Sequence, residues 1–269
     1  MGEDPVVVNR AAWDELALLH GQDRVYDVDG FLRGDDTLDP LETGLVGDAR
    51  GLDLLHLQCH FGLDTLSWAR RGARVTGLDF SAPAVEAARA LSDRAGLDAE
   101  FVQADLYDAV AALGARRFDV VYTGRGALNW LPDIERWAEV MAALVAPGGR
   151  FYLCEMHPFA HVFADDGLTV EHPYFRPEGF VWDDDGGTYA DPDARTEHNR
   201  TIEWSHPVGA VVTALARAGL RIDLLHEHER TFAIGWPFLE RDPGERLFRL
   251  PDGLPSLPLM YSLLATAPA

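Results

Sequence analysis

Short apolar runs and stretches of helical periodicity alternate regularly between residues 52 and 156, and this alternation limits the possible folds more than any other feature. The apolar runs have the length of strands and are bounded by glycine or other turn residues. Such a pattern is typical of an α/β fold in which helices on both faces cover a parallel sheet. We therefore expect strands at 52–57, 74–79, 99–103, 118–122 and 150–156, with helices near 63–71, 82–95, 106–114 and 133–145.

The second half of the chain has a different pattern. Residues 157–200 are rich in proline, glycine, aspartate and aromatic side chains, and they show no helical periodicity. A helix is then expected at 207–218 and strands at 221–226 and 257–266. We interpret 51–269 as one domain in which 157–200 form an inserted substrate cap, and 1–50 as an N-terminal cover over the cofactor and substrate site.

Charge and composition exclude several classes of function. All 23 basic residues are arginine, against 44 acidic residues, so the formal net charge is −21. Without lysine the chain can form no Schiff base, hold no pyridoxal phosphate and build no Walker-type phosphate site. Its negative charge would repel a phosphate backbone, so we expect no nucleic-acid partner. No apolar run approaches the roughly 18 residues that cross a bilayer, so we expect no membrane association.

The cysteines and the first residues suggest a compartment. Cys59 and Cys154 are the only two cysteines, they lie far apart, and neither belongs to a CxxC pair. A zinc site and a disulfide framework are therefore not expected. Acidic residues as early as Glu3 and Asp4 do not fit a signal peptide. We expect a cytoplasmic protein that is a monomer or a homodimer.

Polar residues follow the predicted strands at their carboxyl ends, where ligands of open α/β sheets bind. Gln58-Cys59-His60-Phe61-Gly62 follows the first strand, and the second ends in Asp79, which is placed to accept hydrogen bonds from ribose hydroxyls. Asp105, after the third strand, is placed to reach an adenine amino group. Taken singly, Asp79 is equally well explained as an acid ahead of the Ser81 helix cap, and Asp105 is better explained as a helix cap.

Several of these segments, taken in their order along the chain, resemble those of a known protein family. The segments LLHLQCHFG, GLDFS, ADLYD, FDVVYTGRGALNWLPD and LVAPGGRFYL together resemble the class I S-adenosylmethionine-dependent methyltransferases, especially a bacterial branch that acts on small molecules. The resemblance covers about residues 10–160, and the later helix and two strands match the ending of that fold. It implies a mostly parallel seven-stranded sheet with an antiparallel last strand. It also implies S-adenosylmethionine as cofactor and S-adenosylhomocysteine as product.

The same resemblance implies a set of cofactor-binding residues. In this family the loop after the first strand usually reads as an acidic residue followed by Gly-x-Gly-x-Gly, whereas here only Gly62 remains of the glycines. Gln58, the loop backbone and Thr123 to Gly126 would then hold the methionine part, Asp79 the ribose, and Asp105 with Leu106 the adenine. The cofactor residues predicted in this way are Gln58, Cys59, His60, Gly62, Asp79, Phe80, Asp105, Leu106, Thr123 and Gly124.

Methyl transfer is an in-line displacement, which a general base assists when the acceptor carries a proton. His157 directly follows the fifth predicted strand, His206 lies in a WSHP turn, and Tyr26 belongs to the N-terminal cover. These three residues are the predicted catalytic groups, although each histidine is equally well explained as a hydrogen-bonded residue near a turn. We expect no metal, because no compact ligand pattern is formed by His157, His161, Asp165, Glu171 and His172.

Aromatic side chains are frequent in the cap, among them Phe175, Trp182 and Trp204. They form either a small satellite core or a pocket for a flat acceptor. We predict methylation of carbon, nitrogen or oxygen in a small aromatic or heterocyclic molecule, such as an indole-like ring, in secondary metabolism. One alternative is an NAD-dependent oxidoreductase, because Asp79 could equally bind the ribose of NAD. This chain, however, lacks the G-x-G-x-x-G turn that is typical of such enzymes. Another is a non-catalytic module that binds S-adenosylmethionine.

Overall fold

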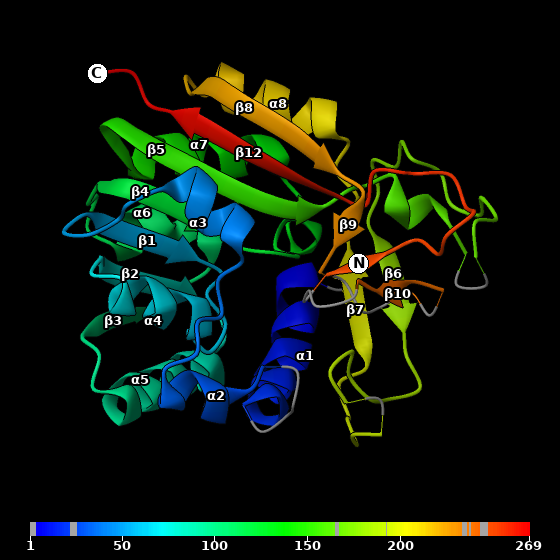
Figure 1. Ribbon diagram of the computed structural model, residues 1–269, viewed down its shortest axis with the longest axis horizontal. Helices are drawn as coiled ribbons and strands as arrows, with labels where there is room; N and C mark the ends of the chain where they lie inside the picture. The colour runs from blue at the N-terminus through cyan, green and yellow to red at the C-terminus, as the bar shows by residue number, and fades with distance from the viewer. Residues whose placement is uncertain are drawn as a thin grey trace.

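A seven-stranded sheet organises the computed structural model, which describes residues 4–21, 26–164, 167–191, 193–232, 236, 238–242 and 247–269. The strands lie in the order β3-β2-β1-β4-β5-β12-β8 (Figure 1). Neighbours from β3 to β5 are parallel, whereas β12 is antiparallel to both β5 and β8. The expected fold class, with its antiparallel last strand, is confirmed.

The strands of this sheet lie close to the predicted ranges. β5 starts five residues earlier than expected, because Val145 already pairs with Phe118, and the chain rejoins the same neighbour where Arg150 pairs with Val120. The strands are β1 (Asp53–Leu57), β2 (Arg74–Asp79), β3 (Ala99–Gln103), β4 (Phe118–Thr123), β5 (Val145–Met156), β8 (Arg221–His228) and β12 (Met260–Thr266).

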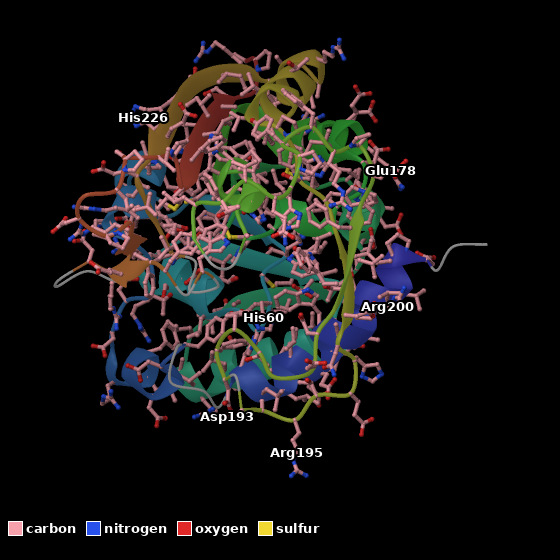
Figure 2. The ribbon with its side chains drawn as sticks, turned by 90° about the vertical axis from the view of Figure 1, so that its right-hand side faces the viewer. His60, Glu178, Asp193, Arg195, Arg200 and His226 are labelled. Carbon is pink, nitrogen blue, oxygen red and sulfur yellow. The ribbon has the colours of Figure 1, made fainter. Side chains whose placement is uncertain are left out.

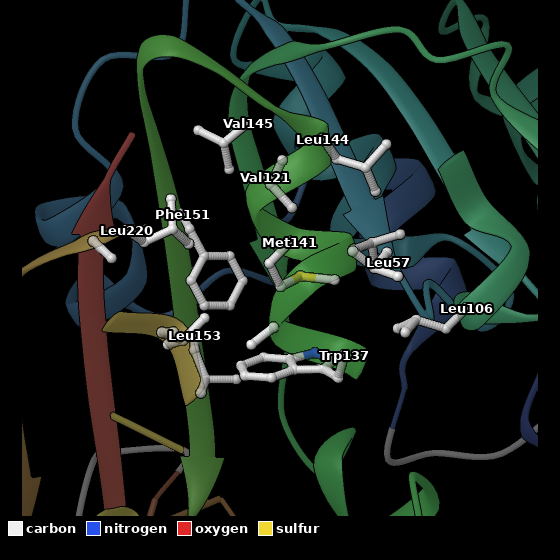
Figure 3. Close-up of a cluster of buried hydrophobic side chains, with 14 of the residues drawn as sticks. Leu57, Leu106, Val121, Trp137, Met141, Leu144, Val145, Phe151, Leu153 and Leu220 are labelled. Atoms are coloured by element: carbon white, nitrogen blue, oxygen red, sulfur yellow. The ribbon is translucent and has the colours of Figure 1, made fainter. Parts of the chain in front are cut away.

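Helices cover both faces of the sheet. α3 (Pro40–Val46), α4 (Leu63–Arg70) and α5 (Ala82–Ala95) pack on one face, and α6 (Ala109–Ala112), α7 (Ile134–Leu144) and α8 (Val208–Arg217) pack on the other. Figure 3 shows α7 placing Trp137 and Met141 against Phe151 of β5. Because successive strand residues face opposite sides, Leu54 and Leu55 of β1 enter different clusters.

Two helical regions differ from the prediction. The helix expected near 106–114 is a 3₁₀ turn, η1 (Leu106–Asp108), followed by the short α6. The N-terminal segment contains α1 (Pro5–His20) and α2 (Val28–Arg33), which the sequence pattern did not indicate. α1 lacks a single apolar stripe because it packs on two sides, against α5 and against β7 (Arg200–Glu203).

Residues 157–200 lie beyond the carboxyl ends of the strands, next to α1 (Figure 1). They contain η3 (Ala160–Val162) and β6 (Phe180–Asp183), which forms a hairpin with β7, the strand that begins at the last residue of this segment. A further small sheet consists of β9 (Arg230–Thr231), β10 (Glu240–Arg241) and β11 (Phe248–Arg249). In the part of the chain that the structure describes, no helix has the length and apolar character needed to cross a bilayer.

Candidate functional site

The loop between β1 and α4 contains three residues with left-handed backbone, at Gln58 (φ 55°), His60 (φ 52°) and Gly62 (φ 81°). These are the positions at which the resembled family has its glycines. Left-handed backbone in a residue other than glycine costs about 1–2 kcal/mol, so it persists only where the surroundings hold it. At Gly62 a side chain is also excluded by space, because a Cβ atom would lie 2.8 Å from the Phe101 ring.

Hydrogen bonds from both sides hold this loop in place. The Cys59 N–H donates to the Leu78 carbonyl (3.0 Å), and the His60 N–H donates to the Asp79 carboxylate (2.8 Å). On the other side, the Gln58 amide donates to the Ala127 carbonyl across 2.9 Å. The loop is therefore tied both to the end of β2 and to the segment after β4, the two strands that flank β1 beside the switch in strand order.

Asp79 is buried at the end of β2, and both of its carboxylate oxygens accept backbone hydrogen bonds. One oxygen is bound by His60 N–H and the other by Ser81 N–H, at 2.9 Å. Burial raises the pKa of Asp79 to about 6, and the backbone donors oppose that rise. Each oxygen has a second lone pair, so the carboxylate can accept further hydrogen bonds from a ligand hydroxyl.

The residues predicted for the adenine end lie next to β2 and β3. Asp105 caps η1 by accepting a hydrogen bond from Tyr107 N–H (2.9 Å), as the alternative interpretation of this residue expected. Leu106 is buried in the core under α7, and the Phe80 ring lies below the Arg10 guanidinium of α1, 5.7 Å from its centroid.

The segment after β4 is held by a buried carboxylate that the prediction overlooked. Glu155, near the end of β5, accepts hydrogen bonds from the backbone N–H groups of Gly126, Ala127, Leu128 and Met156, at 2.7–2.9 Å. Burial raises the pKa of Glu155 to about 7. The sequence prediction treated carboxylates at the ends of strands as contacts to a ligand. Glu155 instead holds the backbone of the neighbouring loop.

Arg125, in the same segment, pairs with Glu42 of α3 across 2.8 Å. Glu42 is buried and also accepts hydrogen bonds from the Tyr122 hydroxyl (2.6 Å) and the Asp39 N–H (2.9 Å). α3 is thereby anchored to the loop after β4. No local pattern indicates this pair, because its members lie 83 positions apart in the sequence.

Thr123 and Gly124 lie at the start of the loop after β4. Thr123 Oγ1 and Gln58 Oε1 are buried, and neither has a hydrogen-bond partner among the described residues. A buried polar atom without a partner costs free energy, and such atoms are usually bound by a ligand or by ordered water. Both belong to residues that were predicted to contact the methionine part of the cofactor.

Two predicted catalytic histidines are engaged in other contacts. His157 Nδ1 accepts a hydrogen bond from Phe159 N–H (3.1 Å), and its Nε2 contacts the Glu227 carboxylate (2.9 Å). His206 Nε2 donates to the Leu131 carbonyl across 2.7 Å. Burial lowers the pKa of both histidines. Both ring nitrogens of His157, and Nε2 of His206, are therefore used in contacts within the chain.

Tyr26, the third predicted catalytic residue, lies in a cluster of rings around the β1–α4 loop. Its ring packs 4.9 Å from Phe61 and 5.2 Å from His20, and its hydroxyl contacts that of Tyr189. Figure 2 shows His60 of this cluster near the middle of the molecule, beside α1. The prediction included Tyr26 and His60 but missed His20, which no strand-end pattern could indicate.

A small pocket lies at the carboxyl ends of β4 and β5, between η2 (Leu128–Trp130) and the turn before α8. Trp204, which follows the cap, belongs to its lining, whereas Phe175 and Trp182 of the cap are exposed. No three metal-ligating side chains come together in the described part of the chain, and Asp165 lies outside that part. The lining consists of Leu128, Asn129, Glu155, Met156, Pro158, His161, Trp204, Ser205, His206 and Tyr261.

Comparison with known proteins identifies the domain that carries this loop. Residues 55–151, from β1 into β5, match the family described as "Methyltransferase domain". Residues 55–151 thus form a methyltransferase domain, and over this range the chain is similar to the class I S-adenosylmethionine-dependent methyltransferases. The matched residues include the β1–α4 loop, Asp79 and the segment after β4, so the family assignment rests on the same residues that form the site.

Similar proteins support the assignment of this domain. The chain is 29% identical over 160 residues to a ubiquinone biosynthesis O-methyltransferase of Salmonella newport, over 58% of the chain, and it spans 65% of that relative's length. Among solved structures it resembles an S-adenosylmethionine-dependent methyltransferase from Mesorhizobium loti (21% identity, TM-score 0.55, 87% of this chain and 99% of that one). It also resembles the DhpI–SAH complex (18%, TM-score 0.58, 100% of both chains). At these identities the solved structures show the shared fold alone.

Proposed function

We propose that the protein transfers a methyl group from S-adenosylmethionine to a small molecule. The observation that carries this proposal is the β1–α4 loop. It keeps left-handed backbone at Gln58, His60 and Gly62, and its His60 N–H is bonded to Asp79 at the carboxyl end of β2. Two of the three left-handed positions are occupied by residues other than glycine, yet the strained conformation is kept. This indicates that the shape of the loop is needed to bind a ligand.

The chain's own residues fit the cofactor. In the proposal Asp79 accepts hydrogen bonds from the ribose hydroxyls, while Phe80, Asp105 and Leu106 border the adenine. The methionine part would be held by the unpaired atoms of Gln58 and Thr123, together with the backbone of Cys59, His60, Gly62 and Gly124. When bound, the cofactor supplies a methyl group on a positively charged sulfur, so the protein needs only to position the acceptor and exclude water.

We place the acceptor between the N-terminal cover (residues 1–50) and the cap (157–200). Asn9 of α1 supports this placement, because its side chain exchanges two hydrogen bonds, each of 2.8 Å, with the backbone of Ile202 in β7, directly after the cap. Glu15, six residues later in the same helix, accepts hydrogen bonds from the N–H groups of Glu197 and His198 in the cap. The cover and the cap are thus joined along one side of the site.

A small aromatic or heterocyclic acceptor suits the rings that border this space. The Salmonella relative is named as an O-methyltransferase, which favours oxygen as the methylated atom. Of the three predicted proton acceptors, Tyr26 lies beside the cofactor loop, whereas His157 and His206 are bonded elsewhere. The net charge of −21 favours acceptors that are uncharged or cationic.

Isothermal titration with S-adenosylhomocysteine and, separately, with NADH tests the proposal. We expect S-adenosylhomocysteine to bind and NADH not to bind. Binding of NADH alone would favour the oxidoreductase alternative and overturn the proposal. Transfer of label from methyl-labelled S-adenosylmethionine to a panel of phenols, indoles and aliphatic amines then separates an enzyme from a non-catalytic binding module.

A further inference from the structure

His20, the last residue of α1, has a buried ring nitrogen without a hydrogen-bond partner, which is true of no other histidine in the described part of the chain. Its side chain is completely buried. Nδ1 lies 3.1 Å from His60 Nε2 and 3.4 Å from the Tyr189 hydroxyl, whereas Nε2 contacts no donor or acceptor. Leaving a buried polar atom unpaired is costly, so Nε2 is expected to bind a group from outside the chain.

Flat side chains surround the His20–His60 pair. Trp13 of α1 packs edge-on against both His60 and Trp130, with 5.2 Å between ring centroids in each case. Tyr26 and Tyr189 pack 5.2 Å and 4.8 Å from the His20 ring. These walls suit a planar aromatic ligand rather than an aliphatic chain.

The position of this cluster relates it to the proposed cofactor site. The His60 N–H is bonded to Asp79, at the ribose end, whereas Trp130 follows the segment expected to hold the methionine end. Trp13 contacts the rings of both residues, so the cluster lies over the part of the site between the two ends. The sulfur that carries the transferable methyl joins the ribose to the methionine chain, so it belongs in this part.

We propose that the cluster binds the methyl acceptor, that the acceptor is a neutral phenol, and that His20 Nε2 binds the phenol hydroxyl and takes its proton during transfer. This inference rests on the proposed methyltransferase function and specifies the acceptor. The phenol oxygen forms the new bond to the methyl carbon as the bond from that carbon to sulfur breaks. The hydroxyl proton moves to the lone pair of Nε2, while Nδ1–H donates to His60 Nε2.

Charge balance allows a buried imidazole to perform this step. Burial lowers the pKa of His20 to about 4, so the ring is neutral and its lone pair is available beforehand. The positive charge on sulfur disappears when its bond to the methyl breaks, and an equal charge arises on His20. The total charge of the site is unchanged, so the step does not bury an additional charge.

The acceptor would enter between Tyr26 and Tyr189, whose hydroxyls contact each other on the outer side of His20. Tyr189 is 45% exposed, and it belongs to the cap, whereas Tyr26 belongs to the N-terminal cover. Separation of these two side chains would open a path to the buried ring without unfolding α1 or the β1–α4 loop.

The test compares binding of 2-naphthol and of its methyl ether, 2-methoxynaphthalene, to protein saturated with S-adenosylhomocysteine, followed by naphthalene fluorescence. Only the naphthol can donate to Nε2, so we expect it to bind about tenfold more tightly than the ether in the wild type. His20→Leu should abolish this preference. His20→Gln can still accept the hydrogen bond and should keep part of the preference, but its methylation of 2-naphthol should fall by about a hundredfold or more.

His226→Gln is the matched control, because His226 lies on the edge strand β8, away from His60 (Figure 2). It should change neither binding nor transfer. Equal wild-type affinity for the two naphthalenes, or a preference that survives in His20→Leu, would overturn the inference. If His20→Leu fails to bind S-adenosylhomocysteine, the inference is judged on two other results. These are the ratio of the wild-type affinities for the two naphthalenes and the rate at which His20→Gln methylates 2-naphthol. Failure of the wild type to bind S-adenosylhomocysteine would instead overturn the proposed function.

Discussion

The backbone N–H of His60 donates to the Asp79 carboxylate across 2.8 Å, and this hydrogen bond joins the loop after β1 to the end of β2. The same carboxylate accepts from Ser81 N–H and so begins α5. One buried side chain therefore fixes both the left-handed loop residue and the ribose end of the proposed cofactor site. Its protonation state should control ligand binding.

We expect the affinity for S-adenosylhomocysteine to fall as the pH drops below about 6, where Asp79 becomes protonated. A ribose hydroxyl donates to the carboxylate, so ligand binding favours the charged form and weakens by up to about tenfold per pH unit below the pKa. Asp14 of α1 and Cys59 of the loop face the same carboxylate, and the charge of Asp14 adds to the upward shift of its pKa.

Isothermal titration between pH 7.5 and 5 checks this expectation. Asp79→Asn should bind at least about tenfold more weakly at pH 7.5, because a charge-assisted hydrogen bond is lost, and its affinity should vary little with pH. Asp98→Asn, an exposed carboxylate, is the control. Wild-type affinity that stays constant down to pH 5 would contradict the role given to Asp79.

Burial of the Glu155 carboxyl should make the free energy of unfolding depend on pH. Its folded-state pKa is raised from the ordinary value of 4.5 to about 7 by burial. Its contribution to stability is therefore full below the unfolded pKa and is lost as the pH rises through about 7. Relative to Glu155→Gln, which does not titrate, the wild type should gain about 2–3 kcal/mol between pH 8 and pH 5. Urea unfolding at both values measures this difference, and a gap that is constant or larger at pH 8 refutes the expectation.

Gly62 and Gly96 allow a clean comparison of space with backbone strain. Both have positive φ, but a Cβ atom at Gly62 would lie 2.8 Å from the Phe101 ring, whereas nothing lies within 4 Å at Gly96. Gly96→Ala should cost about 1–2 kcal/mol for left-handed backbone alone. Gly62→Ala should cost at least about 3 kcal/mol, because the core must also move. Similar losses in urea unfolding would show that Phe101 adjusts freely.

The sheet and its cofactor side were predictable because their signals are local. Apolar runs of strand length mark β1 to β4, and Asp79 is recognisable from its place at the end of a strand. The left-handed backbone at Gln58 and His60 could not be read from residue type, since neither is glycine. It depends on hydrogen bonds to Asp79 and Ala127, which exist only after the sheet has formed.

The contributions of the N-terminal segment were not predictable for a different reason. His20 and Glu42 reach the site from α1 and α3, and the partners that join them to it, His60 for the first and Tyr122 and Arg125 for the second, are 40 or more positions away in the sequence. Pairing at such separation leaves no periodicity and no spacing that a sequence pattern can reveal. Likewise, Glu155 follows a strand as a ligand-binding acid would, yet all of its observed bonds are to backbone.

The ion pair between the buried Glu42 and the partly buried Arg125 provides the last prediction. Arg125→Met should destabilise the protein by about 3–5 kcal/mol, because it leaves the buried Glu42 carboxylate without its cation. Burial raises the pKa of Glu42, so part of this loss should be recovered at low pH, where the carboxyl becomes neutral. Glu42→Gln combined with Arg125→Met removes both charges and should cost less than Arg125→Met alone.

The exposed pair of Arg116 and Glu100 is the control, and Arg116→Met should cost less than about 1 kcal/mol. If Arg125→Met and the double variant unfold at the same urea concentration, the ion pair does not anchor α3 to the loop after β4, and the hydrogen bond from Tyr122 to Glu42 suffices.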